Sequence, residues 1–135
     1  MIAEKIGSQL RGGEIIDLKS DIGGGKTSFV RGLVRGAKST DHVSSPTFTI
    51  SQQYQANDRT IYHYDFYRLP DAGIMRHEIA ELFHQPNTII VVEWSDIIDD
   101  ILPVDRVTIT FVTTGENDRL LEVTYPKKLE YLFFK

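Results

Sequence analysis

The sequence contains no cysteine. This absence excludes a disulfide framework, a thiolate zinc site and a cysteine nucleophile, so any metal must be held by oxygen or imidazole ligands. The sequence also lacks an apolar run approaching the ~20 residues that a membrane-spanning helix needs. Its opening segment, MIAEKIGSQL, carries Glu4 and Lys5 and does not have the pattern of a signal peptide. We therefore expect a cytoplasmic protein that does not enter a membrane.

The sequence also has no excess of positive charge. The chain has 15 Lys and Arg against 19 Asp and Glu, which gives a net charge of −4 and a pI near 5.5. Such a chain does not attract nucleic acid through its overall field, so contact with RNA needs a local patch or a partner. Its 135 residues, 41% hydrophobic and 25% charged, predict one globular domain over residues 1–135 and exclude a wholly disordered chain.

Hydrophobic periodicity predicts an α/β domain. Helices are predicted over residues 2–10, 28–36 and 71–83, the last with Ile74, Ile79, Leu82 and Phe83 as core contacts. Strands are predicted over residues 14–19, 47–51, 60–66, 88–94, 106–113 and 120–125. We expect a mixed sheet flanked by helices, with a parallel core that contains the first and fifth strands and with antiparallel additions.

A glycine-rich segment, SDIGGGKT, links the first strand to a helical pattern. It fits the phosphate-binding loop G-x-x-x-x-G-K-[ST] except at its first position, where Ser20 replaces glycine. In such a loop Lys26 reaches the β- and γ-phosphates and the Thr27 hydroxyl is placed for Mg²⁺. The predicted nucleotide-binding residues here are Asp21, Ile22, Gly23, Gly24, Gly25, Lys26, Thr27 and Ser28. A glycine turn without a ligand is the alternative interpretation.

Two acidic residues end predicted strands. Glu93 closes the nearly all-apolar run IIVVE and is the candidate metal ligand, with a solvated strand-end carboxylate as the alternative. Asp65 is a second candidate, and its alternative is a structural ion pair with Arg68. His63 faces the same side as Asp65 if the segment is extended. It either orients Asp65 or packs in the core.

Four motifs, SDIGGGKT, SPTFT, HYDFYRL and VVEW, occur in this order, and with them the chain resembles the TsaE family over essentially its whole length. The resemblance implies a P-loop ATPase needed for the threonylcarbamoyladenosine modification of tRNA. It also implies ATP or ADP and Mg²⁺ as ligands, and a TsaD–TsaB complex as the partner. That complex transfers a threonylcarbamoyl group to the adenosine beside the anticodon, so contact with tRNA is expected mainly through it.

The resemblance also assigns roles to individual residues. Lys26 corresponds to the phosphate-binding lysine, Thr27 and Glu93 to the Mg²⁺ ligands, and Asp65 to an acid near the metal and the γ-phosphate. These assignments make Lys26, Asp65 and Glu93 the predicted catalytic residues. Three further residues match family positions near the nucleotide: Trp94, Arg119 and Thr47, the last in a loop that resembles a nucleotide-sensing switch.

Two other functions fit the sequence. A scaffold that binds nucleotide without hydrolysing it would show binding without turnover, even with its partners present. A small-molecule P-loop kinase would phosphorylate an acceptor and would need a pocket and usually an arginine-bearing lid. The sequence has no long insertion for such a lid.

Overall fold

The structure is a computed structural model that describes residues 2–20, 25–41, 43, 51–67, 69, 73–115 and 119–134. Its strands are β1 (Ile15–Lys19), β2 (Ser51–Ala56), β3 (Arg59–Asp65), β4 (Thr88–Glu93), β5 (Val107–Thr113) and β6 (Arg119–Thr124). Its helices are α1 (Ile2–Ser8), α2 (Lys26–Gly36) and α3 (Met75–Leu82), with 3₁₀ helices η1 (Ser95–Ile98) and η2 (Lys127–Leu132). Every helix in these described ranges is too short or too polar to span a membrane.

The six strands form one mixed sheet in the order β2-β3-β4-β1-β5-β6. β3, β4, β1 and β5 are parallel neighbours, while β2 and β6 pair antiparallel at the two sides. This order confirms the predicted α/β class and the parallel core that contains the first and fifth strands. The carboxyl ends of four parallel strands therefore meet at one edge, where ligands bind in open α/β sheets.

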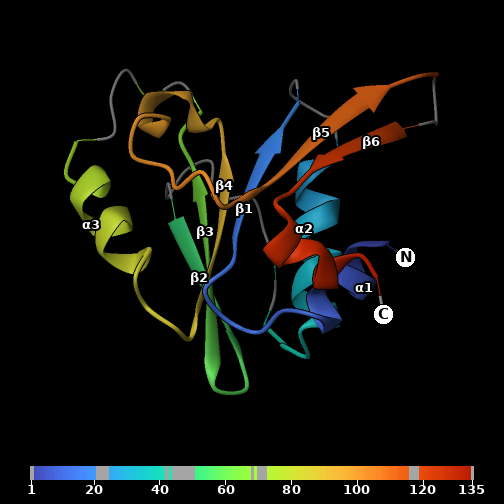
Figure 1. The fold of residues 1–135 in the computed structure, drawn as a ribbon, viewed down its shortest axis with the longest axis horizontal. Helices are drawn as coiled ribbons and strands as arrows, with labels where there is room; N and C mark the ends of the chain where they lie inside the picture. Colours follow the sequence, from blue (N-terminus) through green and yellow to red (C-terminus); the bar gives the residue numbers. More distant parts are fainter. Residues whose placement is uncertain are drawn as a thin grey trace.

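Helices cover both faces of the sheet (Figure 1). α1, α2 and η2 lie on one face and α3 lies on the other. Strand alternation divides β1 between two cores: Ile16 and Leu18 belong to the core under α1 and α2, and Ile15 belongs to the core under α3. β4 is buried at every position, as its nearly all-apolar sequence predicts for a strand covered on both faces.

Two local predictions need correction. The strand beside β3 spans Ser51–Ala56, so the strand prediction that stops at Ser51 missed residues 52–56. Residues 47–50 of the predicted strand lie outside the described residues. The three glutamines of β2 conceal an edge strand that buries only Tyr54 and Ala56. α3 begins at Met75, and Ile74 is 81% exposed, so it is not a core contact. The first two residues of the predicted helix, 71–72, lie outside the described residues.

The carboxyl-terminal segment folds back on the α1 side of the sheet. Leu129 and Leu132 of η2 are buried in the same core as α1 and α2. The Tyr131 hydroxyl donates a hydrogen bond of 2.5 Å to Glu14 Oε2, and the Arg11 guanidinium lies 3.8 Å from the centre of the Tyr131 ring. These contacts make η2 part of the core.

Two glycines let α1 and α2 pack backbone to backbone. A Cβ atom at Gly36 would lie 2.1 Å from the carbonyl oxygen of Glu4, and one at Gly7 would lie 2.1 Å from the carbonyl oxygen of Leu33. Because both obstructing atoms belong to the backbone, a methyl group at either position must separate the helices.

We expect Gly36→Ala to lower the free energy of unfolding by about 1–3 kcal/mol, the usual cost of overpacking a core. Alanine otherwise favours a helix over glycine, so the predicted sign opposes helix propensity. Urea unfolding measures the change, with Arg31→Ala on the exposed side of α2 as the control. A Gly36→Ala variant as stable as the wild type would contradict the close helix contact.

Candidate functional site

Three charged side chains from distant parts of the sequence meet at the carboxyl edge of the parallel strands. Lys26 opens α2, Asp65 ends β3 and Glu93 ends β4. The register pairs Asp65 with Glu93 directly across neighbouring strands. Alternation places Glu93 on the face of β4 that carries Ile89 and Val91, which pack in the core under α2. All three charged side chains are buried, with residue exposures of 4–6%.

Lys26 has contacts with three other residues of the site. Its Nζ lies 3.8 Å from Glu93 Oε1 and 4.4 Å from the centre of the Trp94 ring, and it donates a hydrogen bond of 3.3 Å to the carbonyl oxygen of Ser20. The lysine cation therefore lies between the end of β1, the end of β4 and the start of α2. A lysine in this position offers its charge to an anion that binds at the amino terminus of the helix.

Asp65 is held by its own loop. Its Oδ1 accepts a hydrogen bond of 2.9 Å from the backbone N–H of Tyr67. Burial raises the pKa of the Asp65 carboxyl above its usual value, and the nearby charge of Glu93 raises this pKa further. The Tyr67 hydrogen bond, His63 and Lys26 each lower the pKa, but the net change is an increase. Arg68, the alternative partner predicted from the sequence, lies outside the described residues.

His63 contacts Glu93. Its ring is fully buried, and Nε2 lies 2.5 Å from Glu93 Oε2. Strand alternation in the sequence puts His63 on the same face as Asp65, but it does not reveal the partner. The pairing of β3 with β4 brings Glu93 within reach of the imidazole.

Trp94 forms a tight turn directly after β4. Its φ of 56° is left-handed, a conformation that non-glycine residues rarely adopt. The Ser95 hydroxyl donates a hydrogen bond of 2.7 Å to the buried Asp17 Oδ1, and this bond ties the turn to β1. The Trp94 ring also packs on Tyr67 with ring centres 4.9 Å apart. The turn thus links β1, the segment after β3 and the end of β4.

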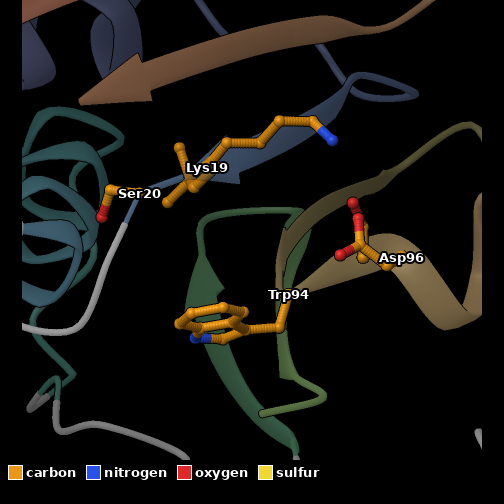
Figure 2. Close-up of a pocket in the computed structure, with 6 residues that line it drawn as sticks. Lys19, Ser20, Trp94 and Asp96 are labelled. Carbon is orange, nitrogen blue, oxygen red and sulfur yellow. The ribbon is translucent and has the colours of Figure 1, made fainter. Parts of the chain in front are cut away.

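The Trp94 ring lines a pocket of about 190 Å³ beside the end of β1. Figure 2 shows the indole projecting toward the side of Ser20, while Asp96 lies on the opposite side of the pocket. The other lining residues are Leu18, Lys19 and Ser95. The position predicted to lie near a nucleotide is therefore beside the segment that enters the glycine-rich loop.

The described ends of the glycine-rich loop fit a phosphate-binding turn. Gly25 has φ of 95° and open space where a Cβ would be, and α2 begins at the next residue. Ser20 does not have a positive φ, so a side chain is tolerated in place of the first glycine. In the first turn of α2, Thr27 is half-buried and Ser28 is exposed. Outside the described residues lie Asp21, Ile22, Gly23 and Gly24.

Of the two remaining predicted residues, the structure describes Arg119 in β6. Thr47 lies outside the described residues. Arg119 begins β6 and pairs with Thr113 at the end of β5. Since β5 runs parallel to β1, Arg119 stands at the same edge of the sheet as the end of β1.

The residues at this edge fit magnesium carried by a phosphate ligand. Thr27 and Glu93 offer hydroxyl and carboxylate oxygens, the ligand type that Mg²⁺ prefers. Among the described residues, no group of three or more His, Asp or Glu side chains is arranged to hold a metal. Few protein ligands, completed by water and substrate phosphates, are typical of Mg²⁺ in nucleotide sites.

Comparisons with known proteins agree on one family. The family model for "Threonylcarbamoyl adenosine biosynthesis protein TsaE" matches residues 1–121. The TsaE protein of Bacillus subtilis is 34% identical over 124 residues, which are 92% of this chain and 76% of that protein. The TsaE protein of Rickettsia typhi is 32% identical over 136 aligned residues, 97% of this chain and 89% of that protein.

A solved structure is similar to this chain in fold as well as in sequence. The crystal structure of Bacillus subtilis YdiB superimposes with a TM-score of 0.74 and 28% sequence identity, covering 97% of this chain and 81% of that one. The fold, the ordered motifs and the matched length are therefore consistent with one another. The chain belongs to the TsaE family of tRNA threonylcarbamoyladenosine biosynthesis proteins.

Proposed function

We propose that this chain is a cytoplasmic, Mg²⁺-dependent ATPase that supports threonylcarbamoyl transfer to the adenosine beside the tRNA anticodon by a TsaD–TsaB-type complex. The observation that carries the proposal is the buried cluster of Lys26, Asp65 and Glu93 at the carboxyl edge of the parallel strands, beside the start of α2. Family membership supports the role in tRNA modification. Contact with tRNA is mainly indirect, through the partner complex.

Each residue of the cluster has a separate task in the proposed reaction. Lys26 attracts the β- and γ-phosphates, and backbone N–H groups at the start of α2 bind phosphate oxygens. Thr27 and Glu93 hold Mg²⁺, which when bound neutralises phosphate charge. Asp65 accepts the proton of the attacking water, a task that its raised pKa favours. ATP and water then give ADP and free phosphate.

The remaining predicted residues surround this reaction centre. Trp94 lines the pocket next to Ser20, where its ring faces the nucleotide in the proposal. Ser28 follows Thr27 in the first turn of α2, and we assign its hydroxyl to the α-phosphate. Arg119 and Thr47 are proposed nucleotide-proximal and switch residues.

ATP hydrolysis measured with and without the TsaD–TsaB pair tests the proposal. We expect slow phosphate release from the chain alone and an increase of about tenfold or more with the partners, since P-loop proteins commonly depend on a partner to complete the site. Nucleotide binding without turnover in both conditions would favour the scaffold. A phosphorylated acceptor in place of free phosphate would favour a kinase. Equal, substantial rates would contradict activation by the partners.

A further inference from the structure

His63 is a buried polar residue for which the proposed reaction has no task. It lies in the middle of β3, between the hydrophobic Ile61 and the acidic Asp65 on the same face. Its exposure is 0%, and its ring centre is 6.4 Å from that of Tyr54 on the edge strand. An imidazole fully removed from water needs hydrogen bonds to offset its desolvation.

Among the described residues, only one of its two ring nitrogens has such a bond. Nε2 lies 2.5 Å from Glu93 Oε2, whereas Nδ1 has no hydrogen-bond partner among the residues that the structure describes. A carboxylate oxygen accepts hydrogen bonds, so we assign the proton of this bond to the imidazole, which then donates from Nε2 to Glu93. An apolar side chain of similar size would fill the same space without burying an unpaired nitrogen. The Nε2 contact is therefore the feature that distinguishes histidine from a packing residue here.

The two oxygens of Glu93 have different partners. Oε2 is bound by His63 inside the sheet, and Oε1 lies 3.8 Å from Lys26 Nζ at the start of α2. The last torsion of a glutamate side chain has a broad preference, so by itself it fixes the orientation of the carboxylate only weakly. The bond from His63 restricts this torsion because it holds Oε2 toward the core. Oε1 is then left on the side of Lys26 and the start of α2.

We propose that His63 is a positioning residue that orients the Glu93 carboxylate toward the magnesium–nucleotide ligand. This inference rests on the proposed function, because it concerns the residue assigned to the metal. His63 itself touches neither nucleotide nor metal. It holds the ligand oxygen in one orientation and thereby favours metal binding, as residues that hydrogen-bond to metal ligands commonly do.

Two substitutions of similar size separate positioning from packing. His63→Gln keeps an N–H donor at nearly the reach of Nε2, whereas His63→Leu fills the space without a donor. Nucleotide affinity is measured with a fluorescent ATP analogue across a Mg²⁺ titration and again in EDTA. We expect His63→Leu to raise, by about 10–100-fold, the Mg²⁺ concentration that gives half of the full increase in nucleotide affinity. This is the usual range for loss of a residue that hydrogen-bonds to a metal ligand. The affinity in EDTA should stay unchanged, and His63→Gln should restore the Mg²⁺ response.

A double-mutant cycle with Glu93→Gln locates the effect. In that background His63→Leu should cause no further loss of the Mg²⁺ response, since the oriented carboxylate is already absent. Thermal unfolding of each variant checks that it is folded. If the leucine variant does not fold, His63→Asn replaces it, because its shorter amide does not reach Glu93.

The possible results distinguish this inference from the proposed function. Equal effects of His63→Gln and His63→Leu, or a normal Mg²⁺ response in His63→Leu, would overturn the positioning role alone. Full additivity with Glu93→Gln would also overturn it. A wild-type chain that binds no nucleotide at any Mg²⁺ concentration would overturn the proposed function together with the inference.

Discussion

Asp65→Asn is expected to retain nucleotide binding and to slow ATP hydrolysis by about 10²–10⁴-fold, the range for loss of a general base. The asparagine keeps an oxygen that accepts the Tyr67 N–H, so the loop at the end of β3 stays in place. It loses the carboxylate, which burial and the neighbouring Glu93 make more basic. Phosphate release and the affinity for a fluorescent nucleotide, measured together, separate these effects.

Glu93→Gln is the matched comparison. This substitution also keeps the shape of the side chain, but it removes the anionic oxygen that lies 3.8 Å from Lys26 Nζ. We expect Mg²⁺-dependent binding and hydrolysis to fall together, because the affected group is a proposed metal ligand. Loss of binding in Asp65→Asn with normal binding in Glu93→Gln would reverse the two assignments.

Lys26→Ala is expected to weaken ATP binding by about 1.5–3 kcal/mol, the usual range for a hydrogen bond to a charged group. This range corresponds to roughly 10–150-fold in the dissociation constant. Removing the lysine also leaves the buried carboxylates Asp65 and Glu93 facing the incoming phosphates without the cation of the loop. Isothermal calorimetry with ATP and Mg²⁺ measures the loss.

Lys5→Ala, at an exposed position of α1, is the control for a change of net charge. Its ATP affinity should equal that of the wild type, because exposed charges far from a site are screened by salt. Unchanged ATP affinity in Lys26→Ala would contradict the whole phosphate-binding interpretation. Equal losses in both variants would show that net charge, and not the position of Lys26, governs binding.

The sequence by itself determined the local elements of this protein. The apolar run before SDIGGGKT and the helical period after it predict a strand, a glycine-rich turn and a helix, and the structure has β1 and α2 in those places. The run that ends at Glu93 predicts a strand covered on both faces, and β4 is buried throughout. These features are readable because alternation and helical periodicity depend only on neighbouring residues. The sequence does not reveal residues 52–56 of β2 as a strand, because their three glutamines conceal the alternation.

Only the tertiary structure decided which of these residues meet. His63 bonds to Glu93 because β3 pairs with β4, and Lys26 faces Glu93 because β1 lies beside β4. Strand order and register join segments that are far apart along the chain, and no local pattern specifies them. The left-handed turn at Trp94 depends on such a contact, since Ser95 bonds to Asp17 on β1. The sequence thus supplied the charged residues of the site, and the pairing of the strands decided how each one is oriented.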